Sequence, residues 1–194
     1  MIFTVICIVF ALMIPTTIKA IAKQKRIGCV SRLKNMGLGY RIFATDNRDM
    51  FPWQLVTNAP APKTFDDVLR HYKAISNELS TPKILVCPSD SRRAAPDLIS
   101  LSRTNISYFV SLDSSESRPD ALLAGDRNVL TNGVRLGPGV VELHSTTTNT
   151  WDGTIHRFQG NVVVGDGSVQ QLSGPRLREQ SSRSGWNSIT LAVP

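Results

Sequence analysis

The sequence predicts an α+β protein in which a long N-terminal helix packs on a small antiparallel β-sheet domain. Three observations carry this prediction: an uncharged apolar run opens the chain, a helical pattern continues beyond it, and short apolar segments separated by turn residues fill the remainder. We expect an apolar, membrane-spanning helix over residues 1–22, an amphipathic stem helix over 23–50 and a globular α+β domain over 51–194.

The composition is that of a folded, basic protein. Of 194 residues, 41% are hydrophobic and 19% charged, which excludes general disorder. The formal net charge of +7 favours an anionic partner, such as phospholipid headgroups, nucleic acid or acidic polysaccharide. The one tight basic group, Lys19, Lys23, Lys25 and Arg26, directly follows the apolar run. We therefore expect it to contact lipid headgroups, and we do not expect a nucleic-acid partner.

The apolar opening, Met1 to Ile18, contains no charged residue. A bilayer core takes about 20 helical residues, so this segment just reaches across one. A buried core helix, a secretory signal cleaved near Ala20-Ile21-Ala22 and a retained anchor are the three interpretations. We prefer the retained anchor because the helical pattern continues past Ala22. The positive-inside rule would place the basic group in the cytoplasm, so charge leaves the orientation of the domain open.

The stem continues this helix on a three-four spacing of apolar residues, which is typical of one buried helical face. These residues are Ile18, Ile21, Ala22, Cys29, Val30, Leu33, Met36, Tyr40 and Phe43. Pro15 is expected to kink the helix, and Asp46-Asn47-Arg48-Asp49 followed by Phe51-Pro52 is expected to end it. A helix of about 40 residues needs partners for both halves: lipid or other anchors for the first, and a β-sheet for the second.

The domain begins with a further predicted helix. Thr64-Phe65-Asp66-Asp67 resembles a capping box and predicts a helix from Phe65 to Leu79. The six predicted strands are Ile84 to Val86, Ile106 to Leu112, Leu122 to Ala124, Val140 to Leu143, Asn161 to Gly165 and Ser168 to Leu172.

Three further segments are assigned from turn and polar residues. Asp166-Gly167 predicts a two-residue type I′ turn between the last two strands, giving a C-terminal hairpin over 161–172. Ser145 to Thr150 is expected to be a polar loop, and the basic tail from Ser173 to Gly185 is expected to be mobile or to lie at an edge.

Several segments occur in an order that resembles a known family. They are Ile27 to Leu38 on the stem, Ala44 to Asn47, Phe51-Pro52, Val86-Cys87-Pro88-Ser89-Asp90, Ile106 to Val110, Leu123-Ala124-Gly125-Asp126-Arg127-Asn128, and His156 followed nine residues later by Asp166-Gly167. In this order and spacing they resemble the type IV pilin-like and type II secretion pseudopilin-like proteins that carry a C-terminal H-x9-DG signature. The start of the sequence departs from the family pattern, because neither the basic leader nor the glutamate within the apolar run is found there. Either the start is truncated or misassigned, or this member has lost leader processing, so cleavage is not carried over to it.

The resemblance implies a function in assembly. It implies a non-enzymatic structural subunit, pseudopilin-like, of a type II secretion or type IV pilus-like envelope assembly. Its partners would be membrane lipid and other pilin-like subunits, bound through the N-terminal helix, and no small-molecule substrate is expected. The chain would cross the bacterial inner membrane once, with its C-terminal domain in the periplasm or on an envelope filament.

Two other functions remain open on the residues. One is a stand-alone, membrane-anchored periplasmic binding protein for polysaccharide or another anionic ligand. The other is a hydrolase that uses His156 and Asp166 as acid–base groups. Because the motifs of catalytic sites are absent from the sequence, we expect His156, Asp166 and Gly167 to be structural, with a histidine hydrogen bond that holds the turn.

Metal and thiol chemistry give two more candidates. Asp152 and Asp166 offer hard oxygen ligands and are weak candidates for calcium, and no other cofactor is expected. Cys7 lies in the apolar run as a small hydrophobe. Cys29 and Cys87 are either a disulfide between stem and domain or two free thiols, because spacing alone does not establish geometry.

Overall fold

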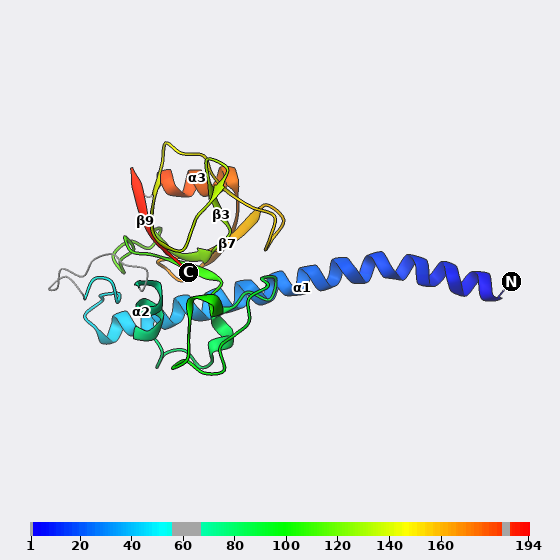
Figure 1. Cartoon of the computed structure of the whole chain (residues 1–194), viewed down its shortest axis with the longest axis horizontal. Coiled ribbons are helices and arrows are strands. Elements are labelled where there is room, and N and C mark those ends of the chain that lie inside the picture. The colour runs from blue at the N-terminus through cyan, green and yellow to red at the C-terminus, as the bar shows by residue number, and fades with distance from the viewer. Residues whose placement is uncertain (1, 56–66, 184–186) are drawn as a thin grey trace.

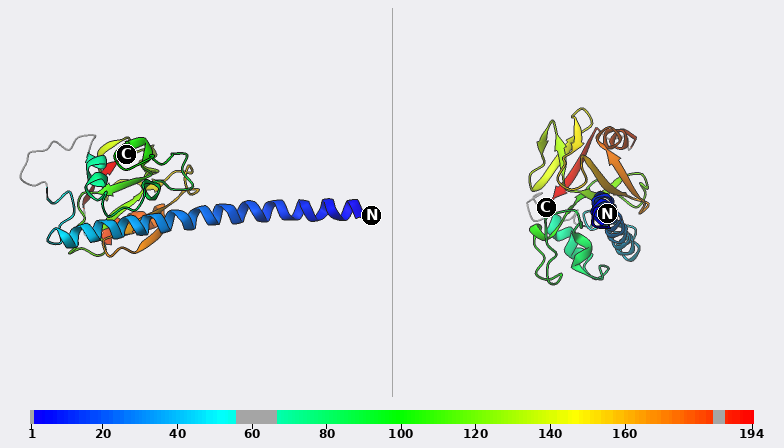
Figure 2. Two further views of the ribbon diagram at one scale, coloured as in Figure 1. Left: turned by 90° about the horizontal axis from the view of Figure 1, so that it is seen from below. Right: turned by 90° about the vertical axis from the view of Figure 1, so that its right-hand side faces the viewer.

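The computed structural model describes the backbone of residues 2–55, 67–183 and 187–194, and the side chains of residues 20–55, 68–180 and 187–194. The chain forms one long helix and an antiparallel β-sheet domain, so the predicted α+β class is confirmed. Helix α1 runs without a break from Ile2 to Asp46 and continues through position 15, where a kink was expected. Its second half lies along the domain and its first half extends away from it (Figures 1 and 2).

Helix α1 ends where the sequence predicts. The amides of Asn47 and Asp49 both donate to the carbonyl of Ala44, and the Asn47 side chain donates to the carbonyl of Phe43. Arg48 and Asp49 then take left-handed backbone angles, with φ of 60° and 59°, which turn the chain out of the helix. Polar side chains and a left-handed turn therefore satisfy the last carbonyls of the helix.

The main sheet has six strands in the order β5-β9-β1-β2-β7-β8, and every neighbouring pair is antiparallel. The strands are β1 (Tyr108–Ser111), β2 (Leu122–Asp126), β5 (Gly139–His144), β7 (Gln159–Val164), β8 (Val169–Ser173) and β9 (Ser188–Val193). Five of the predicted strands are found in it. The sixth strand of the sheet, β9, was not predicted, and it lies between β5 and β1.

A smaller antiparallel sheet has the order β4-β3-β6. Its strands are β3 (Val129–Thr131), β4 (Val134–Arg135) and β6 (Asn149–Trp151). None of these three strands was predicted, and β6 occupies the end of the expected polar loop from Ser145 to Thr150.

Three local predictions are wrong. The segment predicted as a strand at Ile84 to Val86 belongs to a 3-10 helix, η1 (Pro82–Leu85), because Thr81 accepts from the Lys83 amide and Pro82 starts the turn. The tail from Ser173 to Gly185, expected to be mobile or to lie at an edge, instead contains the helix α3 (Gly174–Arg183), which contacts β6 and the edge strand β8. Asp166-Gly167 belongs to a three-residue loop and not to a type I′ turn, since only Gly167 has a positive φ and its amide donates to the Val164 carbonyl.

The predicted helix after residue 65 is shorter than expected. It is α2 (Asp67–Ala74), and the proposed capping residues 64–66 lie outside the described residues. A second short 3-10 helix is η2 (Arg103–Asn105).

The sheet separates two apolar cores. Along β7 the side chains alternate: Val163 belongs to the core under α1, whereas Val162 and Val164 belong to the core on the opposite face. Helices α1 and α2 and η1 cover the first face, and the small sheet and α3 cover the second, as the end-on view in Figure 2 shows. The fold therefore has three layers, with the strands in the middle.

Five fully buried side chains recur every three or four residues on the face of α1 that meets the sheet: Cys29, Leu33, Met36, Tyr40 and Ala44. Gly37 lies on the same part of the helix, and a Cβ there would lie 2.6 Å from Val163 Cγ2 on β7. The absence of a side chain at this position allows the helix backbone to approach strand β7 closely.

Replacing Gly37 with alanine should lower the free energy of unfolding by about 1–2 kcal/mol, because the clash with Val163 outweighs the better helix propensity of alanine. Gly39→Ala is the matched control, since its new Cβ would meet the mobile end of Leu79 at 3.3 Å. Denaturant titrations followed by tryptophan fluorescence should place this control within about 0.5 kcal/mol of wild type. Equal losses in the two variants would show that α1 does not depend on close approach at Gly37.

Candidate functional site

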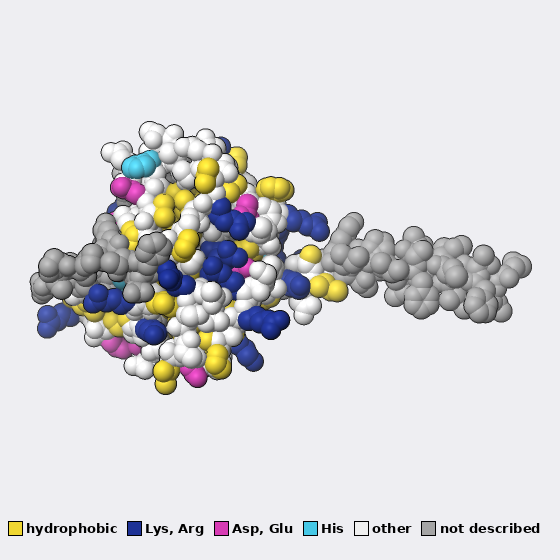
Figure 3. Space-filling model, viewed as in Figure 1, with side chains coloured by type: hydrophobic (Ala, Val, Ile, Leu, Met, Phe, Trp, Pro, Cys, Tyr) yellow, Lys and Arg dark blue, Asp and Glu magenta, His cyan; other side chains and the backbone are white. Residues whose placement is uncertain are grey.

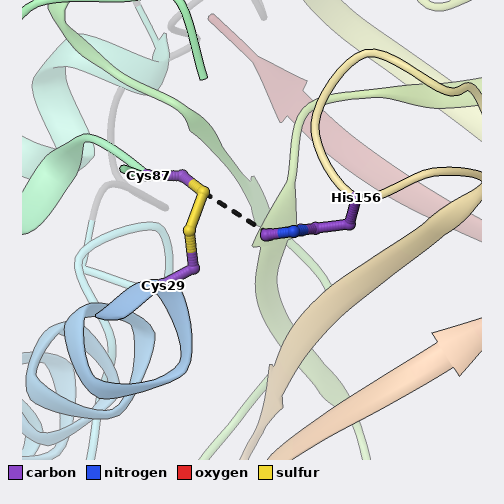
Figure 4. Close-up of side chains that lie close together, drawn as sticks. All are labelled: Cys29, Cys87 and His156. Atoms are coloured by element: carbon purple, nitrogen blue, oxygen red, sulfur yellow. Dashed lines mark hydrogen bonds between the residues drawn. A yellow bond between two sulfur atoms is a disulfide. The ribbon is translucent and has the colours of Figure 1, made fainter. Parts of the chain in front are cut away.

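Four buried side chains from distant segments meet between α1 and the sheet. They are Cys29 from α1, Cys87 from the turn after η1, Asp126 from the end of β2 and His156 from the loop between β6 and β7. Figure 4 shows Cys29, Cys87 and His156 directed toward one another. Three of the four side chains are fully buried, and His156 is 4% exposed. We call this group the buried cluster.

Cys29 and Cys87 form a disulfide, with 4.8 Å between their Cα atoms and a sequence separation of 58. Of the two possibilities that the sequence left open, the structure therefore contains the bridge. It fastens α1 to the segment after η1, and Arg32 one turn later on α1 donates a hydrogen bond to the Val86 carbonyl beside it. A cross-link that closes a loop of this length restricts the unfolded chain.

His156 is held by its backbone as well as by its ring. Arg26 on α1 donates to the His156 carbonyl at 3.0 Å. The next two residues, Arg157 and Phe158, both adopt left-handed angles, with φ of 52° and 65°, which are unusual for residues other than glycine. This sharp turn directs the ring inward, where Nε2 lies 3.4 Å from Cys87 Sγ and 3.4 Å from Asp126 Oδ2.

Asp126 has a divided environment. Its Oδ2 accepts from the amide of Asn161 at 2.6 Å and from the Asn161 side chain at 3.0 Å. Its Oδ1 is buried and has no hydrogen-bond partner among the described residues. An unpaired carboxylate oxygen in a protein interior is costly, so this atom calls for a proton or a ligand.

Burial is the main cause of the pKa shifts of Asp126 and His156. Loss of solvent raises the pKa of Asp126 to about 7, and loss of solvent together with the charge of Arg26 lowers the pKa of His156 to about 4. Both side chains are therefore held toward their neutral forms, with the proton between them on the carboxyl group.

A second polar contact lies beside the cluster and joins the end of β2 to the segment after Cys87. Arg127, which follows Asp126, donates from Nε and Nη2 to the two carboxylate oxygens of Asp90, both at 2.8 Å. Burial alone would raise the pKa of Asp90, but the Arg127 guanidinium holds it below its usual value. The bidentate geometry fixes the segment after Cys87 against the end of β2.

The residues proposed for calcium and for hydrolysis are not brought together. Asp152 pairs with Arg135 and accepts from Thr154, whereas Asp166 Oδ1 accepts from the Ser168 amide in the β7–β8 loop. The His156 ring contacts Cys87 and Asp126, so it does not hold the Asp166-Gly167 turn as expected. That turn is instead joined to α1, because Arg41 donates to the Asp166 carbonyl at 2.9 Å.

Asp126 is the residue that sequence reasoning missed. It lies within the segment Leu123 to Asn128 that contributes to the family resemblance, but it was given no role. The available signal was an acidic residue at the end of an otherwise apolar, fully buried strand, where a charge needs a partner.

Four arginines line a pocket of about 760 Å³ near the C-terminal end of the described chain: Arg92, Arg103, Arg127 and Arg135. Its remaining wall is largely apolar and includes Leu136, Pro138 and Val193. Burial and the nearby charge of Arg127 lower the pKa of Arg92 to about 10. Lys and Arg side chains are spread over the face shown in Figure 3, and several gather near its middle. We call this cavity the arginine pocket. Its charges already have partners within the chain, since Arg127 pairs with Asp90, Arg135 pairs with Asp152, and Arg92 donates to the Pro194 carbonyl.

The outer side of α1 also exposes apolar side chains. Ile21, Ile27, Leu38 and Ile42 are 53%, 60%, 54% and 43% exposed, and they lie on the side of the helix away from its buried face. Large exposed apolar residues that share one side of a helix are typical of a surface that another molecule covers.

In comparisons with known proteins, no protein-family model, no curated protein and no solved structure matches the chain. Among the residues that the structure describes, no helix is both long enough and apolar enough to cross a membrane. The segment expected as an anchor, Met1 to Ile18, lies outside the residues whose side chains are described.

Replacing Asp126 with asparagine should change how stability depends on pH. The folded pKa of Asp126, about 7, lies above its usual value of 3.8, so its stabilising contribution is complete below about pH 4 and is lost as the pH rises through 7. Relative to wild type, Asp126→Asn should therefore gain free energy of unfolding between pH 4 and 7, by up to about 4 kcal/mol.

His156 acts in the opposite direction, since its lowered pKa withdraws stability as the pH falls from 6.5 toward 4. The two contributions oppose each other in wild type, and the variant should show the histidine slope alone. Denaturant titrations at several pH values measure this difference, and parallel curves for wild type and variant would contradict the assigned shifts.

Proposed function

We propose that the chain is a pilin-like structural subunit, of the pseudopilin type, in a type II secretion or type IV pilus-like envelope assembly. The observation that carries this proposal is the division of α1. One half is part of the core of a small antiparallel domain, and the other half projects from it (Figure 1). A projecting helix needs lipid or other helices around it, because an isolated helix gains little stability in water.

The contacts that hold the second half of α1 on the domain support this proposal. The disulfide, the close approach at Gly37 and the hydrogen bond from Arg41 fasten the second half at three points along its length. The domain would therefore move as one piece with its helix, so force applied to the projecting half would be transmitted to the domain.

The outer side of α1 supports assembly of several copies. The exposed side chains of Ile27, Leu38 and Ile42 lie along the half that is seated on the domain, beyond the reach of a membrane that holds only the first half. A second copy of the chain would cover them by helix–helix packing.

The segments that carry the family resemblance also meet in space. Cys87 and Asp90, Asp126 and Arg127, and His156 belong to three of these segments and contact one another beneath α1. Residues that share one buried cluster are constrained together, which supports treating the resemblance as one pattern. The disulfide fits a domain in the periplasm, outside the reducing cytosol.

The arginine pocket supports a second candidate function, a membrane-anchored periplasmic binding protein for an anionic ligand such as an acidic polysaccharide. Planar guanidinium groups above an apolar wall suit carboxylate, sulfate or phosphate groups on a larger molecule, which would have to compete with Asp90 and Asp152 for Arg127 and Arg135. This function requires no self-assembly, so one experiment separates the two.

A photo-crosslinking amino acid placed at Ile21 or Leu38 in the full chain, expressed in bacterial membranes, should give a ladder of covalent multimers on irradiation. The reason is that each position would lie against a neighbouring copy. Ile99 is the matched control, being an isoleucine that is 90% exposed on the domain and not on α1. Denaturing electrophoresis should show the ladder at the two helix positions only. A single dimer band, or monomers at every position, would contradict the assembly and favour the anchored binding protein.

A further inference from the structure

The buried cluster contains the donor atoms of a metal site as well as a disulfide. We propose that, once the Cys29–Cys87 bridge is reduced, the two thiolates, His156 Nε2 and the Asp126 carboxylate bind one Zn²⁺ ion. This inference goes beyond the proposed function and does not depend on it. Sulfur, imidazole and carboxylate ligands in a set of four are those that zinc takes in proteins.

The distances fit a tetrahedral site. Zinc bonds to sulfur, nitrogen and oxygen of about 2.0–2.3 Å place neighbouring ligand atoms about 3.4–3.8 Å apart. His156 Nε2 is 3.4 Å from Cys87 Sγ and 3.4 Å from Asp126 Oδ2. The ligand atoms of Cys29, Cys87 and His156 all lie within 4.8 Å of one another, as Figure 4 illustrates. The two sulfurs have to separate, as they do when their bond is broken, and the Asp126 carboxylate, which contacts the group through His156, has to move toward them.

The environment of Asp126 points to a missing ligand. Its Oδ1 is fully buried and lacks a partner among the described residues, while Asn161 fixes the other oxygen beside His156. A cation in the cluster would give this carboxylate a directly bound counter-charge, whereas the Arg26 guanidinium acts on it only without direct contact.

A surface pocket opens beside the cluster and reaches it at His156. Its volume is about 470 Å³, and its lining includes His156 and Ser89 together with Lys23, Lys25, Arg26 and Arg157. Because its charged lining residues are basic, the pocket favours the approach of an anionic reductant such as a thiolate.

The chemistry balances with a small dithiol as the reductant. Its thiolate attacks one sulfur of the Cys29–Cys87 bridge, a mixed disulfide forms, and the second thiol of the reductant displaces the other cysteine. The dithiol is oxidised to its own disulfide, and Cys29 and Cys87 gain two electrons and two protons between them. Zn²⁺ then replaces the two thiol protons and any proton on Asp126, and these protons leave to solvent.

The ion would keep α1 fastened to the domain after the covalent bridge is lost. Two of its ligands, Cys29 and Cys87, are the residues that the disulfide joins, and the other two belong to the sheet and to the β6–β7 loop. The site would thus replace one cross-link between the helix and the domain with another.

The full chain in detergent, reduced with a phosphine and then freed of reductant without oxygen, should bind one Zn²⁺ per chain. The disulfide-bonded chain should bind none at this site. Metal content after desalting gives the stoichiometry, and Co²⁺ gives the visible absorption of tetrahedral thiolate coordination. Cys87→Ser should abolish binding, and His156→Gln and Asp126→Asn should each weaken it by more than about tenfold. His144→Gln, at an exposed histidine, is the matched control and should bind as wild type does.

If the reduced chain unfolds, circular dichroism can measure whether the metal restores the fold. In that case Zn²⁺, and not Mg²⁺, should restore the folded signal, because binding and folding are then one equilibrium. A reduced chain that stays folded without taking up zinc would overturn the proposal. So would an unfolded chain that zinc does not restore, or equal binding by wild type and His156→Gln.

Discussion

The domain is organised around the contact between one face of α1 and strands β2, β7 and β8. Cys29, Leu33, Met36, Tyr40 and Ala44 are fully buried there, and the sheet reaches the helix backbone at Gly37 through Val163. No other helix of the described chain offers so long an apolar face to the sheet, since α2 has 8 residues and α3 has 10. Without this half of α1, one face of the sheet would expose its core side chains to water. The helix is therefore part of the domain and not a tether attached to it.

The polar contacts at this interface fix the register of α1 on the sheet. Apolar packing allows a helix to slide or rotate at modest cost, whereas a disulfide, a buried carboxyl–imidazole contact and a bidentate ion pair are satisfied in one register only. They lie near the point at which α1 leaves the domain, because Arg26, one turn before Cys29, already donates to the His156 loop. The direction of the projecting half is fixed there, which is what a subunit that assembles through its helix would require.

Sequence periodicity predicted the parts of the fold that depend on local pattern. Apolar spacing gave α1 and its end at Asp46, and apolar runs between turn residues gave β1, β2, β5, β7 and β8. Periodicity failed to predict the elements whose conformation depends on contacts with distant segments. Strand β9 follows a polar tail, and it takes a central place only through its pairing with β5 and β1. The Ile84 to Val86 segment has strand-like residues, but Thr81 and Pro82 start a 3-10 turn. In the buried cluster, His156 and the two cysteines stood out in the sequence, whereas Asp126 and its contact with His156 arise from a separation of 30 residues that no local pattern encodes.

The most direct measurement of the central claim is hydrogen–deuterium exchange along α1 in the full chain, in detergent and without partners. If the second half of the helix belongs to the core, the amides of residues 29–44 should exchange as slowly as those of β2 and β7, through global unfolding. The amides of residues 20–26, which precede the buried face, should exchange faster by orders of magnitude. Equal, fast exchange along residues 20–44 would contradict the account, because α1 would then be a helix resting on a domain that is stable without it.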